Sequence, residues 1–218
     1  MEREKLWHEL EEKGVIRHDQ HIVLSSRLHT PDYASFVPAG IHLSLRQSLL
    51  DELEYIARRS NFYFAAPNHR VVLSTGCANW YASGLADRYE APWLYAEKDG
   101  ADALLLRRNQ ARHLTGATVL IVDDAIVTGQ SLRALTALAF QNEAGSVFVA
   151  TLLDRGQAQT KNLQFFSRAV PVVSVFHKPM PTWEKAMCPQ CRAGVPFSTQ
   201  HGKGPEEFHR YGQPEKAK

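Results

Sequence analysis

From residue 70 onward, short apolar segments alternate with helical ones, and this alternation constrains the fold more than any other feature of the sequence. RVVLSTG, APWLYAEK, ATVLIVDD and SVFVATLLD are apolar runs of strand length. The segments ANWYASGLADRYE and QSLRALTALAFQNE carry apolar residues at helical spacing between them. Strands that are apolar on both faces and joined by helices form a parallel sheet covered by helices. The sequence therefore predicts an α/β fold with a twisted, mainly parallel sheet flanked by helices.

Composition excludes several classes of protein. The 218 residues suffice for one domain with small additions. The formal net charge is +2 and the basic residues are scattered, so we expect neither a nucleic-acid partner nor a membrane partner. Three cysteines are too few for a disulfide framework, and the charged start MEREKLWHELEEKG lacks the apolar core of a signal peptide. We expect a cytoplasmic protein.

We expect three segments along the chain. Residues 1–60 contain two helical patterns, with the strand-like and turn-like stretch HIVLSSRLHTPDYASF between them. Residues 61–178 form the α/β core, although strand and helix signals weaken after residue 156. Residues 179–218 are rich in Pro, Gly and polar residues, and we interpret them as an extension whose last dozen residues are mobile.

The stretch VLIVDDAIVTGQSL, residues 119–132, is the most specific signal in the chain. A strand over 118–122 is expected to deliver Asp123 and Asp124 to the sheet edge, where a parallel sheet binds its ligands. A helix is expected to begin near Ser131 or Leu132. The same edge receives the segments STGCAN, AEKDG and LDRG, which follow the other strands.

The loop after the two aspartates has the properties of a phosphate site. Thr128, Gly129, Gln130 and Ser131 lie at the start of the expected helix, where free N–H groups and the helix dipole attract an anion. Gly129 permits close backbone approach, and the hydroxyls of Thr128 and Ser131 can donate hydrogen bonds. The loop is not a P-loop, because no Lys follows the Gly, and it lacks the three-glycine dinucleotide fingerprint.

The paired carboxylates suit a sugar diol. Ionised Asp123 and Asp124 are acceptors for two vicinal hydroxyls, or for the water around a Mg²⁺ ion. A diol site beside a phosphate loop indicates a phosphorylated sugar as ligand. The alternative is a plain strand, turn and helix with solvated aspartates.

This stretch resembles the 5-phosphoribosyl-1-pyrophosphate (PRPP) motif of the type I phosphoribosyltransferases. The resemblance implies that fold, with a small hood made of N-terminal and C-terminal segments. It also implies that the two acids hold the ribose hydroxyls and that the loop cradles the 5-phosphate, with Mg²⁺ as cofactor. The motif residues are Asp123, Asp124, Ala125, Val127, Thr128, Gly129, Gln130 and Ser131.

Further segments resemble the orotate phosphoribosyltransferases within this family. HIVLSSRLHTPDY, LYAEKDGADALLLRR, LLDRG and CPQCRAGVPF match in order, over roughly residues 18 to 198. The resemblance implies a base-binding set of Ser25, Ser26, Arg27, Tyr33 and Arg155. From chemistry alone, Arg155 can pair bidentately with a planar carboxylate. The alternatives are a simple hairpin around Ser25 and a surface salt bridge within Asp154-Arg155.

A charged hairpin follows the strand APWLYAEK. It contains Glu97, Lys98, Arg107 and Arg108, with Asp99-Gly100 at its turn. The resemblance described above implies that Glu97 and Lys98 contact PRPP. In the family this loop is a mobile flap that reaches the active site of a second subunit, which implies a homodimer. Cations there stabilise charge on the departing pyrophosphate, so Lys98, Arg107 and Arg108 are candidate catalytic residues with Asp124. The alternative is an exposed charged hairpin.

The family's pyrophosphate loop corresponds to STGCANW. Thr75, Gly76, Ala78 and Asn79 are the candidate contacts, but Ala78 and Asn79 occupy positions where the family usually has glycines. Backbone N–H groups at the start of the next helix can still meet an anion. This change motivates the alternative that the protein binds PRPP without turnover.

Cys188 and Cys191 form a CxxC pair, which is half of a zinc site. His177, His201 or His209, or a second subunit, are candidates to complete it. The alternative is a pair of free thiols in a turn.

The function that these segments favour is transfer of the 5-phosphoribosyl group of PRPP to orotate. The products are orotidine 5-monophosphate and pyrophosphate, a step of pyrimidine nucleotide biosynthesis. Arg27 replaces a usual Gly and Val127 replaces a frequent Thr, so a phosphoribosyltransferase for another heterocyclic base is a second hypothesis.

Overall fold

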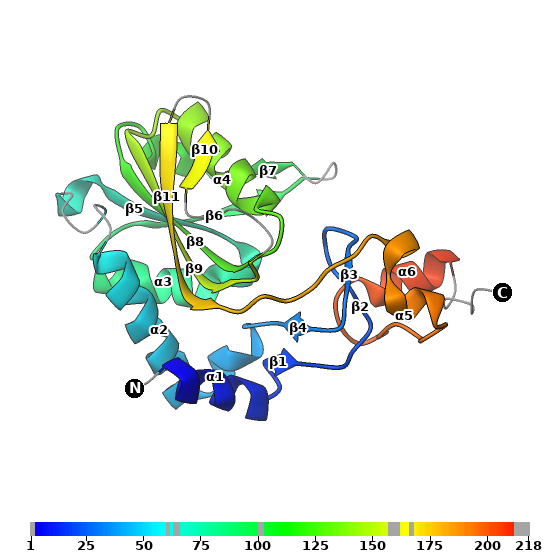
Figure 1. Cartoon of the computed structure of the whole chain (residues 1–218). Coiled ribbons are helices and arrows are strands. Elements are labelled where there is room, and N and C mark those ends of the chain that lie inside the picture. Colours follow the sequence, from blue (N-terminus) through cyan, green and yellow to red (C-terminus); the bar gives the residue numbers. More distant parts are fainter. Residues whose placement is uncertain are drawn as a thin grey trace. The chain divides into compact units, whose positions relative to one another are not determined.

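The computed structural model describes residues 3–59, 62, 66–99, 103–156, 162–165 and 168–211 (Figure 1). The chain forms two compact units, which we call the core unit and the small unit. The core unit contains Met1–Leu6 and Phe36–Lys178, and the small unit contains Trp7–Ser35 and Pro179–Lys218. The expected N-terminal segment, 1–60, is therefore divided between the two units.

The core unit is built on one seven-stranded sheet with the order β10-β11-β9-β8-β5-β6-β7. The pairs from β11 through β9, β8 and β5 to β6 are parallel, whereas β10 and β7 pair antiparallel at the two edges. The predicted mainly parallel sheet is confirmed. The strands are β5 (Arg70–Thr75), β6 (Trp93–Lys98), β7 (Leu104–Leu105), β8 (Thr118–Ile126), β9 (Ser146–Asp154), β10 (Asn162–Phe165) and β11 (Arg168–His177).

Helices cover this sheet because its central strands are apolar on both faces. On one face, Leu132 and Leu135 of α4 pack against Val119, Ile121 and Val149 in a buried core. The helices α2 and α3 pack against each other and against strands of the same sheet (Figure 1). The helices are α2 (Leu43–Arg58), α3 (Asn79–Arg88) and α4 (Gln130–Gln141), with 3-10 turns at Pro38–Ile41, Pro67–His69, Gly76–Ala78 and Gln110–His113.

The strand that carries the two aspartates is longer than predicted. We expected it to end at Val122, but β8 continues to Ile126 because its last residues pair with β9. Its pairing with β5, in contrast, stops at Val122. Asp123 and Asp124 therefore lie within a strand, at the point where its neighbour on one side has ended.

The sheet also gains a strand where the sequence signal was weak. β11 pairs in parallel with β9 from Val172 to His177. Pro171 precedes this pairing and interrupts the apolar pattern, which explains the weak signal after residue 156.

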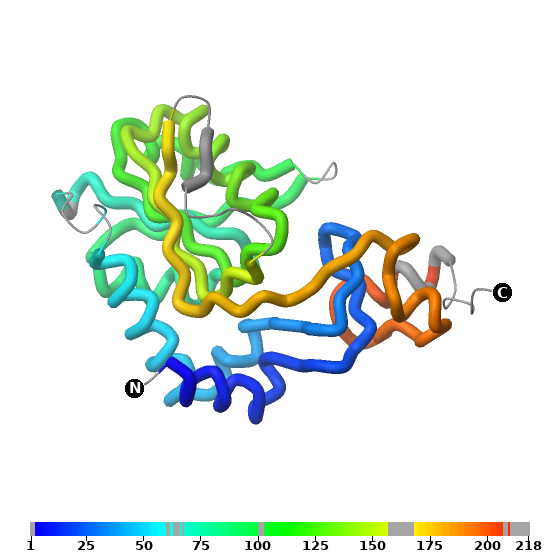
Figure 2. The backbone as a smooth tube through the Cα atoms, in the orientation of Figure 1, coloured from blue at the N-terminus to red at the C-terminus, as the bar shows by residue number. Residues whose placement is uncertain are grey.

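The small unit is assembled from both ends of the chain, drawn blue and orange to red in Figure 2. The elements of the small unit are most of α1 (Arg3–Glu12), β1 (Ile16–Arg17), β2 (Ile22–Val23), β3 (His29–Thr30), β4 (Tyr33–Ala34), a 3-10 turn (Lys185–Met187), α5 (Pro189–Arg192) and α6 (Gly204–Tyr211). The C-terminal extension is more regular than expected, because α6 reaches into the last dozen residues; residues 212–218 lie outside the described part.

None of the described helices is long and apolar enough to cross a membrane.

A tight turn joins β2 to β3 in the small unit. The N–H of Arg27 donates to the carbonyl of Leu24 over 2.9 Å, and the N–H of Leu24 donates to the carbonyl of Leu28 over 2.8 Å. Arg27 has a φ of 66°, in the left-handed region that glycine adopts without strain. A glycine at this position would adopt the same turn without strain.

Replacing Arg27 with Gly is expected to raise the free energy of unfolding by about 0.5–1 kcal/mol, because a left-handed non-glycine residue costs roughly 1–2 kcal/mol. The substitution also removes an ion pair to Glu206, at 3.4 Å between exposed side chains, which contributes little. Urea unfolding measures the change. Arg27→Ala is the control, since it removes the ion pair but keeps the strain; equal stability of the two variants would contradict the argument.

Candidate functional site

The carboxyl ends of β5, β6, β8 and β9 lie at one edge of the core unit. Parallel strands present their carboxyl ends at the same edge, and the registers of these four strands are continuous. Thr75 pairs with Ala96, Val122 with Ser74, and Ile126 with Asp154. The predicted common rim of STGCAN, AEKDG, DDAIVTGQS and LDRG is confirmed for the residues that the structure describes, which do not include Gly100.

The two aspartates are the centre of this rim. Asp123 is only 4% exposed, and its Oδ1 accepts hydrogen bonds from the N–H of Asp124 (3.1 Å) and the hydroxyl of Thr75 (3.4 Å). Asp124 is partly exposed, and its Oδ1 accepts a 2.8 Å hydrogen bond from the N–H of Ala125. The backbone and Thr75 thus fix the orientation of both carboxylates, which is what a binding site for a diol or a cation needs. The alternative of freely solvated aspartates is wrong for Asp123.

Their surroundings make the ionised form of both carboxylates costly. Burial, and then the charge of Asp124, raises the pKa of Asp123 well above its usual range. Desolvation also raises the pKa of Asp124. Hydroxyl donors or a cation would stabilise the ionised carboxylates of Asp123 and Asp124. The two residues therefore favour a ligand that carries hydroxyl groups, a bound cation, or both.

A pH dependence of stability follows from these shifts. Because the folded carboxylate of Asp123 holds its proton more tightly than the unfolded one, the unfolding free energy of the ligand-free protein is expected to fall as the pH rises from about 4. The expected loss is about 1.4 kcal/mol for each unit by which the folded pKa exceeds the unfolded pKa. Urea unfolding at several pH values measures it, and Asp123→Asn should flatten the slope. An unchanged slope in this variant would contradict the assignment.

The loop after β8 leads directly into α4. The helix begins at Gln130, slightly earlier than the predicted Ser131 or Leu132, and Gly129 precedes it with a φ of 73°. The Thr128 hydroxyl accepts a 3.3 Å hydrogen bond from the N–H of Gln130, and Ser131 is exposed in the first turn. Gly129 provides no side-chain cap, so the first N–H groups and the positive helix end suit an anion. Val127 lies in the loop between the strand and this site.

The segment after β5 is a short 3-10 turn and not an open glycine loop. Gly76–Ala78 forms this turn and α3 begins at Asn79. Neither Ala78 nor Asn79 adopts a positive φ, and Ala78 is fully buried. The side chain of Asn79 accepts a 3.4 Å hydrogen bond from the Ser74 hydroxyl. The two residues in the usual glycine positions therefore serve to start a helix.

The candidate cations lie in the hairpin of β6 and β7, with Lys98 at the end of β6 and Arg107 and Arg108 after β7. Glu97 pairs with Arg107 at 2.9 Å and with Arg108 at 2.7 Å, and the hydrogen bond from Arg108 is the main cause that lowers the pKa of Glu97. Lys98 is exposed at the end of β6. Arg107 and Arg108 are also exposed but are held by Glu97, whose position in the strand orients them. The turn residue Gly100 lies outside the described residues.

Arg155 follows β9 at the same rim. It is 2% exposed, and its N–H donates to the carbonyl of Ile126 over 3.1 Å. Its neighbour Asp154 is also buried, accepts a 2.8 Å hydrogen bond from the N–H of Gly156, and lies 3.4 Å from His177 Nδ1. The alternative placed this turn on the surface, and that placement is wrong, because both residues are buried.

The other candidate base-binding residues lie in the small unit. Ser25, Ser26 and Arg27 form the turn between β2 and β3, and this hairpin matches the alternative interpretation of the segment. Tyr33 in β4 stacks on His201, with ring centroids 5.1 Å apart and planes 22° apart. Their role in base binding stays a prediction.

Two residues that the sequence interpretation missed lie beside the cysteine pair. His21 and His29 approach Cys188 and Cys191, whereas His201 stacks on Tyr33 and His177 lies near Asp154 in the core unit. In the described residues the candidates His177, His201 and His209 are therefore wrong as partners of the cysteines. The signal available in the sequence was a histidine at each end of the segment HIVLSSRLH.

No protein-family model matches the chain. Its sequence is 27% identical to an orotate phosphoribosyltransferase of Thermus thermophilus over 179 residues, which covers 81% of this chain and 90% of the relative. Among solved structures it is similar to orotate phosphoribosyltransferase from Aeropyrum pernix, with a TM-score of 0.60, 21% identity, and coverage of 79% of this chain and 93% of the other. An adenine phosphoribosyltransferase gives a TM-score of 0.60 at 20% identity, covering 78% and 99% of the two chains.

Proposed function

Since this chain has the type I phosphoribosyltransferase fold and resembles orotate phosphoribosyltransferases in sequence, we propose that it transfers the 5-phosphoribosyl group of PRPP to orotate. The observation that supports this most directly is the oriented pair Asp123 and Asp124 beside the N-terminus of α4. A carboxylate pair and an anion site next to each other match the diol and the phosphate of one sugar phosphate. The products would be orotidine 5-monophosphate and pyrophosphate.

In this proposal the sugar phosphate is held from two sides. Asp123 and Asp124 accept hydrogen bonds from the two ribose hydroxyls, which offsets the cost of burying their charge. The N–H groups at the start of α4 and the hydroxyls of Thr128 and Ser131 donate to the 5-phosphate. The ribose is thereby held with C1 free to react.

Two adjacent carboxylates whose ionised form is destabilised are also a donor set that fits Mg²⁺. We propose Asp123 and Asp124 as the residues that would hold the ion together with PRPP. When bound, Mg²⁺ neutralises charge on the departing pyrophosphate. Lys98 is exposed at the end of β6 on the same rim, and we propose it as a further cation for this group.

The chemistry needs no covalent bond to the protein. An orotate nitrogen forms a bond to C1 as the bond from C1 to the pyrophosphate oxygen breaks, and the proton of that nitrogen is released to solvent. Positive charge develops on the sugar as this bond breaks, and the chain's main contribution is to hold both substrates in line. We propose that Arg155, at the rim and buried, meets the carboxylate of orotate.

We further propose that the hairpin of β6 and β7 acts as a flap that a second copy of the chain shares. Glu97 holds Arg107 and Arg108 in ion pairs that are exposed and therefore weak. A ligand with several phosphate oxygens can replace Glu97 as their partner. Sedimentation with and without PRPP tests the homodimer.

A second candidate function is binding of PRPP without turnover. It is favoured by the 3-10 turn over Gly76–Ala78, where the family has a glycine loop. In this turn Ala78 is fully buried and neither Ala78 nor Asn79 adopts a positive φ, so the backbone is less open to close approach of pyrophosphate than a glycine loop would be. The sugar-phosphate side of the site is unaffected.

The test is a turnover assay with PRPP, Mg²⁺ and orotate, measured in both directions, with calorimetric titration of PRPP beside it. Formation of orotidine 5-monophosphate with release of pyrophosphate is the expected result. If another base consumes PRPP and orotate does not, the acceptor is wrong but phosphoribosyl transfer stands. PRPP binding without pyrophosphate release for every base would favour the second candidate.

A further inference from the structure

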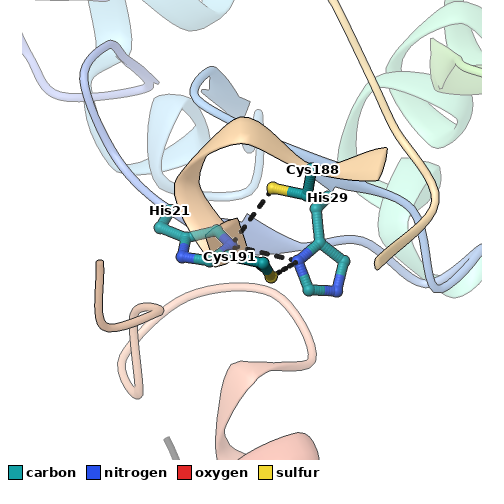
Figure 3. A group of neighbouring side chains, drawn as sticks. All are labelled: His21, His29, Cys188 and Cys191. Carbon is teal, nitrogen blue, oxygen red and sulfur yellow. Dashed lines mark hydrogen bonds between the residues drawn. The ribbon is translucent and has the colours of Figure 1, made fainter. Parts of the chain in front are cut away.

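Four side chains that can ligate a metal meet inside the small unit, from two segments far apart in the sequence (Figure 3). His21 lies just before β2, His29 begins β3, Cys188 precedes α5 and Cys191 lies within it. Their ligand atoms all lie within 4.8 Å of one another. The two histidines are 3% and 1% exposed, and Cys188 is fully buried.

The spacing of these atoms matches a tetrahedral zinc site. His21 Nε2 lies 3.5 Å from the Sγ atoms of both Cys188 and Cys191, and His29 Nδ1 lies 3.3 Å from Cys191 Sγ. The two nitrogens are 3.0 Å apart. Zinc bonds of about 2.0 Å to nitrogen and 2.3 Å to sulfur, at tetrahedral angles, require separations of about 3.3 Å between nitrogens and about 3.5 Å between nitrogen and sulfur.

The surrounding hydrogen bonds orient the ligands toward one point. His21 Nδ1 donates to the carbonyl of Val195 over 2.7 Å, which leaves the lone pair of Nε2 directed at the other three ligands. His29 is held through its backbone, since its N–H donates to the carbonyl of Trp183 (2.7 Å) and its carbonyl accepts from the N–H of Trp183 (2.9 Å). The backbone of His21 is held in the same way, since its carbonyl accepts a 2.7 Å hydrogen bond from the N–H of Ser198.

We propose that His21, His29, Cys188 and Cys191 bind one structural Zn²⁺ ion. Four protein ligands complete the tetrahedron and leave no open position for substrate, which is typical of structural sites and not of catalytic ones. The cysteines bind as thiolates and the histidines as neutral rings, so binding releases the thiol protons to solvent.

The small unit has the properties of a fold that needs such a cross-link. Its strands β1, β2, β3 and β4 are each two residues long, and they form only two-stranded sheets. Two-stranded ribbons are marginal in water, and small units with little core are commonly held by a metal or disulfides. In the described part of the chain, the three cysteines form no disulfide. The ion would join Trp7–Ser35 to Pro179–Lys218, the two segments of this unit.

The first test is the metal content of the full-length protein, purified without chelators and measured by plasma mass spectrometry. We expect one zinc per chain. Cys188→Ser and His21→Ala should lose it, whereas two matched controls should retain it: Cys77→Ser, which changes an exposed cysteine of the core unit, and His201→Ala, which changes a histidine of the small unit outside the cluster. Less than about a tenth of an equivalent of zinc, or an equivalent of iron in its place, would overturn the assignment.

Cobalt substitution keeps the proposal testable if the ligand variants fail to fold. After zinc is removed from the wild-type protein with a chelator, one equivalent of Co²⁺ should produce the visible bands of a tetrahedral ion and the ultraviolet band of thiolate-to-cobalt charge transfer. The chelated protein should also show a lower Tm that Zn²⁺ restores. Absence of these bands, with an unchanged Tm, would mean that the cluster is a hydrogen-bonded pair of histidines beside two thiols.

The zinc proposal is independent of the proposed enzymatic function. The candidate sugar-phosphate residues all lie in the core unit, and the zinc content is measured without substrate. A protein that holds zinc but does not turn over PRPP, or the reverse, would refute one proposal and leave the other intact.

Discussion

Asp124→Asn is expected to raise the Kd for PRPP about 10- to 100-fold, with the fold retained. A hydrogen bond to a charged group contributes about 1.5–3 kcal/mol, and the amide keeps the shape of the side chain while losing the charge. The amide oxygen can still accept the hydrogen bond from the N–H of Ala125, so the backbone of β8 should be unaffected. The charge of Asp124 is one of the causes that raise the pKa of Asp123, so this substitution should also lower the pKa of Asp123.

Calorimetric titration of PRPP in the presence of Mg²⁺ measures the affinity, and circular dichroism with thermal unfolding verifies the fold. Asp87→Asn, an exposed aspartate on α3, is the matched control and should bind PRPP like the wild type. Unchanged affinity in Asp124→Asn would remove this residue from the sugar site.

The sheet and its rim could be predicted from the sequence because they depend on local patterns. Each central strand is an apolar run, and each crossover has helical spacing, so β5, β6, β8 and β9 and the helices between them were found. The end of β8 could not be predicted, because Ala125 and Ile126 continue the strand only through their pairing with β9. β11 could not be predicted, because Pro171, just before its pairing with β9, interrupts the apolar pattern that indicates a strand.

The small unit shows where sequence reasoning stops. The CxxC motif indicates half of a site, but the neighbouring His21 and His29 are separated from Cys188 and Cys191 by more than 150 residues. They lie in the segment that the family resemblance assigns to base binding. His177 and His201 are closer to the cysteines in the sequence but do not belong to the cluster. Distance along the chain therefore does not indicate which histidines lie beside the cysteines. Likewise, the left-handed φ of Arg27 follows from the turn that joins β2 and β3, which no property of arginine indicates.

Arg155→Ala is expected to raise the KM for orotate about 30-fold or more while the Kd for PRPP changes less than about threefold. This prediction rests on the proposed function. Loss of one partner from a buried charge pair costs about 2–5 kcal/mol, and Arg155 is buried at the rim. Arg155→Lys should recover only part of the affinity, because an ammonium group keeps the charge but not the two parallel hydrogen bonds of a guanidinium.

Because Arg155 is buried, its replacement can also weaken the fold, and the comparison of the two substrates separates these effects. Steady-state kinetics gives the KM for orotate and calorimetry gives the Kd for PRPP, with Arg112→Ala, an exposed arginine of the core unit, as the matched control. A selective loss for orotate assigns the base carboxylate to Arg155. An equal loss for both substrates, together with a lower Tm, would instead mean that the buried side chain of Arg155 stabilises the rim where β8 and β9 end.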